Sequence, residues 1–231
     1  MGHPTDWDSQ RKLLEASLAD VRTSAVAITP AENWQASVHG LSRKIPNQSI
    51  LCGYSMGARL ALGMALDFPE SCSGLIFVSG NPGLESDIDR QERWAADQSI
   101  AKQVAVKPAQ SFLENWYQQP VFATVPAPIR QSETEKKLSN YSESWSEIMR
   151  TLSVSKQPNF WPRLNELTMP VLILAGQNDK KYKQIALRIG KENDSDHLSI
   201  EIVPESGHLP HREQPHLFSQ IVSKFIRDVI S

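Results

Sequence analysis

The sequence has few of the features that mark several large classes of protein. Its 231 residues include only two cysteines, Cys52 and Cys72, which are too few for a disulfide scaffold or a cysteine metal cluster. We therefore expect both to be small buried thiols. No run approaches the roughly 20 apolar residues that a membrane-spanning helix needs, and the first six residues show no basic-then-apolar signal pattern. These absences predict a soluble, cytoplasmic protein.

An excess of one charge is also missing. The chain has 24 lysines and arginines against 26 aspartates and glutamates, a formal net charge of -2. Because no bulk field then attracts nucleic acid or an anionic membrane, we expect neither as a partner. Any charged ligand must be held by local groups.

Short apolar runs alternate with helical segments along the chain. The length and the 40% hydrophobic content suffice to bury the core of one domain, with room for an inserted lobe. The middle runs are almost continuously apolar, as in parallel strands covered by helices on both faces. The sequence therefore predicts an α/β fold with a mostly parallel sheet, whose strands lie at 25–28, 50–52, 74–78, 171–175 and 198–203.

The alternation stops between residues 84 and 159, where no strand pattern occurs and prolines at 120, 126 and 128 separate helical pieces. We interpret 84–159 as a helical lid inserted into a core formed by 1–83 and 160–231. Four of the six tryptophans lie in this region or just beyond it: Trp94, Trp116, Trp145 and Trp161. For most of these aromatics, the simpler interpretation is a satellite core under the lid.

A serine lies between two glycines at Gly53-Tyr54-Ser55-Met56-Gly57, after an apolar run and before a predicted helix at 56–68 that Pro69 ends. This is the G-x-S-x-G pattern of a nucleophile elbow, in which a sharp strand-to-helix turn exposes the serine hydroxyl. The flanking glycines allow the close backbone approach that such a turn needs. The pattern is short, so its meaning depends on partners elsewhere in the chain.

A nucleophilic serine needs a base and a carboxylate that orients the base, and both follow in the chain order Ser, Asp, His. Asp179 follows the run 171–175, and His208 follows the run 198–203 within Ser-Gly-His. The carboxyl ends of parallel strands meet at one edge of a sheet, so we predict a triad of Ser55, Asp179 and His208. Weaker candidates for the carboxylate are Asp194 and Asp196; His211 and His216 are expected to be structural or exposed.

Several separated segments make the chain resemble the α/β-hydrolase superfamily, and within it the family of 2-succinyl-6-hydroxy-2,4-cyclohexadiene-1-carboxylate synthases of menaquinone biosynthesis. The resemblance covers nearly the whole chain, and its most discriminating motif is Trp-Tyr-Gln-Gln-Pro-Val-Phe in the predicted lid. The segments are 53–59, 81–84, 116–122, 157–158, 176–181 and 207–208.

The resemblance implies a lyase that removes a proton and eliminates pyruvate, with no acyl-enzyme and no cofactor or metal. Ser55 would act as a base through His208, and the Met56 N–H would stabilise the enolate. The implied small-molecule substrate carries several carboxylates, which Tyr54, Arg59, Arg93, Trp116 and Lys181 would contact or enclose. The residues themselves support Arg59, because it lies one helical turn after Ser55 on the same face and a guanidinium can hold a carboxylate bidentately.

The chain departs from this family in two places. Lys137 stands where relatives often carry an arginine, so the charge is kept without the planar fork. A His-Gly-Phe segment and the third strand, which the family places ahead of the acidic residue and tryptophan at Asp6-Trp7, do not occur. Unpaired buried backbone groups are costly. We therefore expect the true start to lie upstream of Met1. Two alternatives are that the strands at 25–28 and 50–52 pair directly with each other, or that another chain supplies the missing strand.

Three functions of different kinds remain open at this point. The first is the lyase, which the lid motif, Arg59 and Arg93 favour. The second is a serine hydrolase of esters, thioesters or carbon–carbon bonds that uses the same triad in an apolar pocket. The third is a catalytically impaired relative, against which the intact Ser55, Asp179 and His208 argue. The sequence does not indicate the oligomeric state.

Overall fold

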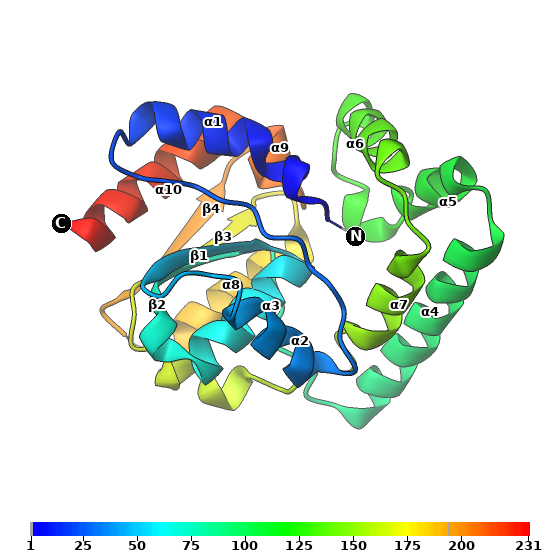
Figure 1. Cartoon of the computed structure of the whole chain (residues 1–231), viewed down its shortest axis with the longest axis horizontal. Helices are drawn as coiled ribbons and strands as arrows, with labels where there is room; N and C mark the ends of the chain where they lie inside the picture. The colour runs from blue at the N-terminus through cyan, green and yellow to red at the C-terminus, as the bar shows by residue number, and fades with distance from the viewer. Residues whose placement is uncertain (1, 194) are drawn as a thin grey trace.

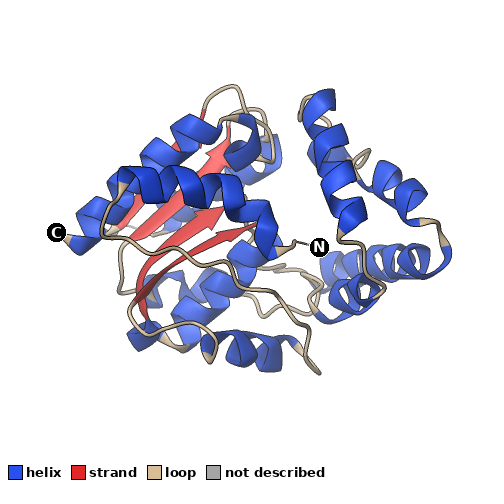
Figure 2. Ribbon diagram, turned by 45° about the horizontal axis from the view of Figure 1, so that its top comes forward, coloured by secondary structure: helices blue, strands red, loops and turns tan. Residues whose placement is uncertain are grey.

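A parallel sheet of four strands forms the centre of the protein (Figures 1 and 2). The computed structural model describes residues 2–193 and 195–231. The strands lie in the order β1-β2-β3-β4 and every pair is parallel. Their bounds are β1 Ser49–Tyr54, β2 Cys72–Val78, β3 Val171–Gly176 and β4 Leu198–Val203. Four of the five predicted strands are therefore confirmed.

Helices cover both faces of this sheet. The bounds of the helices that flank it are α1 Asp8–Ser17, α2 Trp34–Ser42, α3 Met56–Asp67, α8 Lys180–Glu192, α9 Pro210–Glu213 and α10 Pro215–Ile230. Short 3-10 turns are η1 Pro4–Trp7, η2 Pro69–Ser71, η3 Pro120–Phe122 and η4 Trp161–Glu166. Helices α1 and α10 pack on one face, and α2, α3 and α8 lie on the other (Figure 1).

The side chains of β2 explain why its sequence is continuously apolar. Leu75 and Phe77 belong to the hydrophobic cluster on the α3 side, whereas Ile76 and Val78 belong to the cluster on the α10 side. Successive side chains of a strand point to opposite faces, and here both faces are covered. The predicted α/β class is thus confirmed by the packing of the central strands.

The predicted strand at 25–28 is wrong. The segment from 21 to 31 forms no helix or strand, and β1 is the edge of the sheet, paired with β2 alone. A strand requires a neighbour with which to exchange hydrogen bonds, and in the described ranges the segment 25–28 makes no ladder with β1. The alternative that these two segments close up and pair directly is therefore also wrong.

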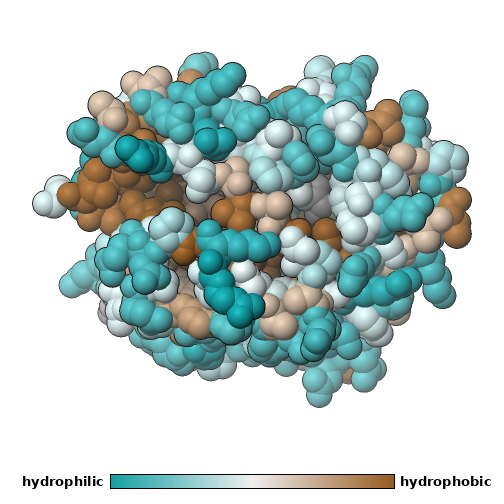
Figure 3. Space-filling model, viewed as in Figure 1, coloured by the Kyte–Doolittle hydropathy of each residue, from teal (hydrophilic) through white to brown (hydrophobic). Residues whose placement is uncertain are grey.

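A large cavity occupies the space beside the open edge of β1. It has a volume of about 1120 Å³ and extends from the loop after β1, between β1 and the segment 21–28, to Ile230 at the end of α10. Figure 3 shows hydrophobic side chains gathered around the end of α10 and along the hollow that crosses this view of the molecule. The cavity reaches the carboxyl edge of the sheet, where the predicted site lies.

Four helices follow β2 before the chain returns to β3. They are α4 Asp87–Val106, α5 Ala109–Trp116, α6 Ala127–Ser139 and α7 Ser144–Thr151, and they stand to one side of the sheet (Figure 1). They occupy the segment that the sequence predicts as a lid, 84–159. The division of the chain into a core and a lid stays a prediction.

The tryptophans of this region do not form one separate core. Trp145 and Trp161 belong to the largest hydrophobic cluster, which continues into the helices on the sheet. Trp116 is half-buried and also contacts a small cluster around Phe122, and the half-buried ring of Trp94 lies 4.2 Å from the Lys156 ammonium. The helical region is therefore joined to the sheet domain by continuous apolar packing. No helix in the described residues is both long and apolar enough to cross a membrane.

Candidate active site

The turn between β1 and α3 has the strained geometry of a nucleophile elbow. Ser55 has φ 51° and ψ -107° and immediately precedes α3, an unusual conformation for a residue with a side chain. A Cβ on Gly53 would lie 2.3 Å from the Gly57 carbonyl oxygen, so this position requires glycine. A Cβ on Gly57 would meet nothing within 4 Å. The close backbone approach that we expect at both glycines therefore occurs at Gly53; at Gly57 the described residues leave room for a side chain.

Asp179 and His208 form the acid–base pair that the sequence predicts. His208 Nδ1 lies 2.7 Å from Asp179 Oδ2, and the two side chains are almost completely buried. A Cβ on Gly176 would lie 2.0 Å from the Gly207 carbonyl oxygen, so the end of β3 and the loop after β4 touch at a glycine. This close approach brings the carboxylate to the imidazole.

Aromatic rings enclose the imidazole of His208. Its ring centroid lies 4.6 Å from that of Tyr182, 5.2 Å from that of Tyr54 and 5.7 Å from that of Phe122. Since Tyr54 directly precedes Ser55, this packing brings His208 to the elbow. In the described ranges no hydrogen bond joins the Ser55 hydroxyl to His208 within 3.5 Å. The triad roles of Ser55, Asp179 and His208 stay predictions.

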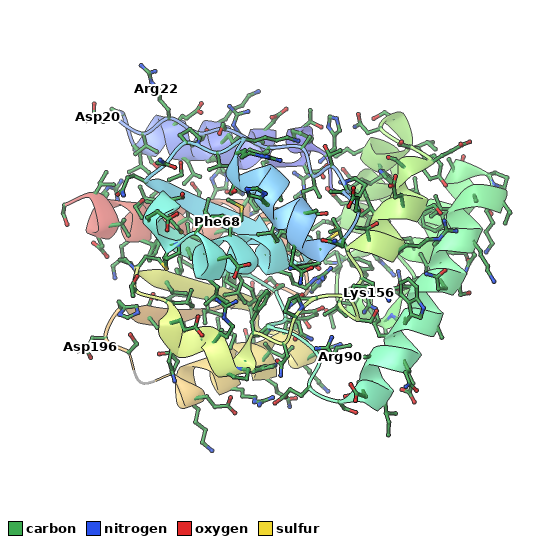
Figure 4. All side chains as sticks on the ribbon, turned by 60° about the horizontal axis from the view of Figure 1, so that its bottom comes forward. Asp20, Arg22, Phe68, Arg90, Lys156 and Asp196 are labelled. Atoms are coloured by element: carbon green, nitrogen blue, oxygen red, sulfur yellow. The ribbon has the colours of Figure 1, made fainter. Side chains whose placement is uncertain are left out.

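The competing candidates lie elsewhere. Asp196 is exposed, and Figure 4 shows it at the end of the molecule away from helices α4 to α7. Asp194 lies outside the described residues. His211 is buried and stacks on Trp7, with ring centroids 5.0 Å apart. This packing fits the structural role that we expect for His211, although the residue also lines the cavity, and His216 is exposed.

The Met56 N–H is available at the start of α3. In the described part of the chain it donates no hydrogen bond, whereas the neighbouring Ser55 N–H donates to the Val78 carbonyl at 2.8 Å. Free N–H groups at a helix N-terminus favour negative charge. Met56 can therefore serve as the predicted donor to an enolate or oxyanion.

The cavity brings together the other residues that the sequence predicts for substrate binding. Its lining includes Tyr54, Ser55, Met56, Arg59, Arg93, Trp116 and Lys181. Asp179 and His208 are not part of the lining. Burial raises the pKa of Tyr54 well above its usual value, so its phenol stays a neutral hydrogen-bonding group.

Arg59 is a buried cation that has only neutral partners. Its Nη1 donates to Gln157 Oε1 at 3.1 Å and its Nη2 donates to the Leu152 carbonyl at 2.8 Å. Among the described residues no carboxylate oxygen lies within 4.0 Å of its guanidinium. Burial lowers the pKa of Arg59 to about 10, which still leaves it charged at neutral pH.

The two other predicted cations differ in their surroundings. Arg93 Nε lies 2.9 Å from both carboxylate oxygens of Asp97, so part of its charge is already balanced. Lys181 makes no ion pair in the described ranges, and its ammonium lies 5.7 Å from the Tyr182 ring centroid. Burial and then the charge of Arg93 lower the pKa of Lys181. Two neighbouring cations at one end of the cavity favour an anionic ligand.

Some site residues were not predicted, or not in their observed setting. Gln157 belongs to a segment of the family resemblance, yet nothing in its spacing indicates a contact with Arg59. Lys137, which departs from the family pattern, forms a partly buried ion pair with Asp6 that joins α6 to η1. Cys52 is not the buried thiol that we expected: its side chain is open to the cavity, because β1 is an edge strand. Cys72 is buried, as predicted.

The strained serine turn, the buried carboxylate–histidine pair and the parallel sheet define an α/β-hydrolase fold. A model of the Alpha/beta hydrolase family matches residues 2–221, and the chain belongs to this family. The solved structure named "Structure of MenH from S. aureus" aligns with a TM-score of 0.82 at 24% identity, over 96% of this chain and 90% of that one. A thermophilic esterase from Thermogutta terrifontis aligns with a TM-score of 0.71 at 20% identity, over 96% and 86% of the two chains.

Similar sequences indicate which members of this family the chain resembles in sequence. The chain is 31% identical over 211 residues to 2-succinyl-6-hydroxy-2,4-cyclohexadiene-1-carboxylate synthase of Serratia proteamaculans, covering 91% of this chain and 78% of that protein. It is 33% identical over 192 residues to the synthase of the same name from Photorhabdus laumondii, covering 80% of this chain and 66% of that protein. The chain thus spans about two thirds of the length of the Photorhabdus relative, and within its family it groups with these synthases.

Proposed function

We propose that the protein is a lyase that eliminates pyruvate from 2-succinyl-5-enolpyruvyl-6-hydroxy-3-cyclohexene-1-carboxylate, as the names of its sequence relatives suggest. The observation that carries this proposal is the buried guanidinium of Arg59, which lines the cavity one helical turn after Ser55 and has no carboxylate partner in the described ranges. A buried charge is costly unless it is paired. A substrate carboxylate would supply the missing counter-charge beside the elbow.

In the proposed reaction His208, oriented by Asp179, accepts the Ser55 proton, and the serine oxygen removes a proton from a ring carbon of the substrate. The electron pair of that C–H bond forms a double bond between ring carbons 2 and 3, the existing double bond moves from carbons 3 and 4 to carbons 4 and 5, and the C–O bond from carbon 5 to the enolpyruvyl group breaks. The pyruvate enolate leaves and takes up a proton on carbon. The Met56 N–H would stabilise the negative charge that develops in this step, and Lys181 and Arg93 would bind further carboxylates.

The alternative of a serine hydrolase uses the same three residues, and the structural match to an esterase favours keeping it as an outcome of the test. The two functions differ in the charge of the ligand. A hydrolase of neutral esters has no use for an unpaired buried cation, whereas the proposed substrate carries several carboxylates. The cytoplasmic location predicted from the sequence stays a prediction.

The test is pyruvate release from this substrate, followed with lactate dehydrogenase and NADH, for the wild-type chain and Ser55→Ala. We expect the variant to lose essentially all turnover, as removal of a triad member does elsewhere. Ser71→Ala is the matched control, since Ser71 lies beyond the other end of α3 and its hydroxyl donates to Asn47. Unchanged pyruvate release by Ser55→Ala would rule out the triad, and hydrolysis of a p-nitrophenyl ester without pyruvate release would favour the hydrolase.

A further inference from the structure

Gln157 is the only side chain that hydrogen-bonds the Arg59 guanidinium in the described residues. It is completely buried, and its two amide atoms have different partners. Its Oε1 accepts from Arg59 at 3.1 Å, and its Nε2 donates to the Asn81 carbonyl at 3.0 Å. Because a carbonyl oxygen can only accept, the Asn81 contact fixes which way the amide points. The oxygen is therefore directed at Arg59.

The backbone of Gln157 is fixed as well. Arg90 of α4 donates from Nη1 to the carbonyls of Gln157 and Ser155, at 2.9 and 3.0 Å. Figure 4 shows Arg90 and Lys156 close together where the helical region joins the sheet domain. Gln157 thus lies in a rigid segment that approaches α3, and the position of its side chain cannot adjust freely.

The neutrality of this residue has a chemical consequence. A glutamate has nearly the same shape and would also accept from Arg59, but its charge would neutralise the guanidinium in a site of low dielectric. It would also face the Asn81 carbonyl with an oxygen instead of an N–H. A glutamine holds the guanidinium in place and leaves its positive charge available to the cavity.

We propose that Gln157 is a positioning residue that sets the specificity of the site for an anionic ligand, by fixing Arg59 through an uncharged acceptor. This inference rests on the proposed function for the identity of the substrate, but its basis is the contact set of Arg59. Gln157 does not line the cavity, so it acts through Arg59 and not on the substrate. The ligand that this arrangement favours is a carboxylate, bound by the N–H groups of Arg59 that Gln157 and Leu152 do not use.

Two variants separate this role from simple anchoring of the helical region. In Gln157→Glu the acceptor for Arg59 is kept, a charge is added and the hydrogen bond to the Asn81 carbonyl is lost. In Gln157→Met the shape is kept and both side-chain hydrogen bonds are lost. We expect Gln157→Glu to raise KM for pyruvate release roughly tenfold or more with a smaller change in kcat, since an interaction with a charged group is lost. Gln157→Met should raise KM less, because Arg59 keeps its charge.

The pH dependence provides a signature that anchoring alone does not produce. Protonation of the introduced carboxylate at acid pH removes the added charge, so the ratio of KM between Gln157→Glu and wild type should fall toward one as the pH is lowered. The corresponding ratio for Gln157→Met should stay constant with pH. A purely structural role predicts instead that the rise in KM of each variant follows its loss of stability, measured by urea denaturation at the same pH.

Binding of succinate, a simple dicarboxylate, tests the inference separately from turnover. It is measured by isothermal titration calorimetry on the wild type and both variants, and we expect the affinity to fall most in Gln157→Glu. The wild type and the two variants could bind succinate with the expected order of affinities while the wild type releases no pyruvate. In that case the proposed lyase activity fails and the role of Gln157 stands. Equal succinate affinity in all three proteins, or no binding by the wild type, overturns the role of Gln157.

Discussion

Asp179 holds His208 with one carboxylate oxygen and the start of helix α8 with the other. Its Oδ2 lies 2.7 Å from His208 Nδ1, and its Oδ1 accepts from the Tyr182 N–H at 3.3 Å. A carboxylate held at both oxygens has little freedom to rotate. The pair therefore places the Nδ1 proton between His208 and Asp179, which leaves Nε2 as the basic nitrogen.

The first prediction is that Asp179→Asn lowers kcat for pyruvate release by about 10⁴-fold, because an amide nitrogen facing Nδ1 reverses the tautomer of the imidazole. The fold should be kept, since asparagine also caps helices well. Asp196→Asn is the control, because Asp196 is an exposed carboxylate outside the pair. Steady-state kinetics measures the loss of activity, and circular dichroism checks that the fold is kept. Equal kcat in both variants would exclude Asp179 as the orienting residue.

The second prediction concerns the two glycines of the elbow, which differ in the space available for a side chain. Gly53→Ala should destabilise the protein by about 1–3 kcal/mol or more, as overpacking does, because its Cβ would lie 2.3 Å from a backbone oxygen. Gly57→Ala should instead stabilise by up to about 1 kcal/mol, because alanine favours a helix and its Cβ has open space. Urea denaturation gives both values. A loss of stability in Gly57→Ala would show that this space is filled in solution.

The central strands and the order of the site could be predicted because local pattern encodes them. Continuous apolar runs such as 74–78 indicate strands buried on both faces, and parallel strands place Ser55, Asp179 and His208 at one edge whatever lies between them. These inferences need only the chain order and the period of the hydrophobic residues. They do not need the details of packing.

The parts that could not be predicted depend on partners far away in the sequence. The run 25–28 has the composition of a strand, but whether it forms one depends on a neighbour, and the same open edge exposes Cys52 to the cavity. Gln157 meets Arg59 across 98 residues and Lys137 meets Asp6 across 131. No local spacing encodes such contacts, and only the family resemblance drew attention to the segment around Gln157.

A third prediction follows from the position of Cys52 on β1. The thiol faces the cavity and not the bulk solvent, and desolvation by the surrounding protein raises its pKa to about 12. At pH 8 only about one molecule in ten thousand would then carry the reactive thiolate. We expect slow alkylation by iodoacetamide at Cys52, with a rate that rises about tenfold per pH unit up to the pKa.

Cys72 is the internal control for this experiment, because it is buried in the sheet and should react only after unfolding in urea. Peptide mass spectrometry identifies the alkylated residue over time. Preferential labelling of Cys72 in the folded protein would contradict the structure. Complete protection of Cys52 up to pH 10 would show that the edge of β1 is covered.

The last prediction concerns the pH dependence of stability. The buried ring of His211 lies among Trp7, Tyr54 and Phe218, with ring centroids 5.0, 4.7 and 5.9 Å away. The pKa of His211 is lowered from an ordinary value of 6.5 to about 3, chiefly by burial; the charge of Asp6 opposes this shift, and those of His208 and Lys137 add to it. Between these pH values the unfolded chain binds more protons at this position than the folded one. His211 therefore contributes a loss of stability as the pH falls from about 6.5 toward 3, with a slope of up to about 1.4 kcal/mol per pH unit.

His211→Phe removes this proton uptake and keeps an aromatic ring in an aromatic pocket. We expect its free energy of unfolding, measured in urea between pH 4 and pH 7, to depend on pH less steeply than that of the wild type, by up to about 1.4 kcal/mol per unit. His216→Phe on the exposed side of α10 should keep the slope of the wild type. Because the other titrating groups near His211 are the same in the variant and the wild type, the difference between their slopes isolates His211, and identical slopes would show that it is protonated equally in the folded and unfolded states.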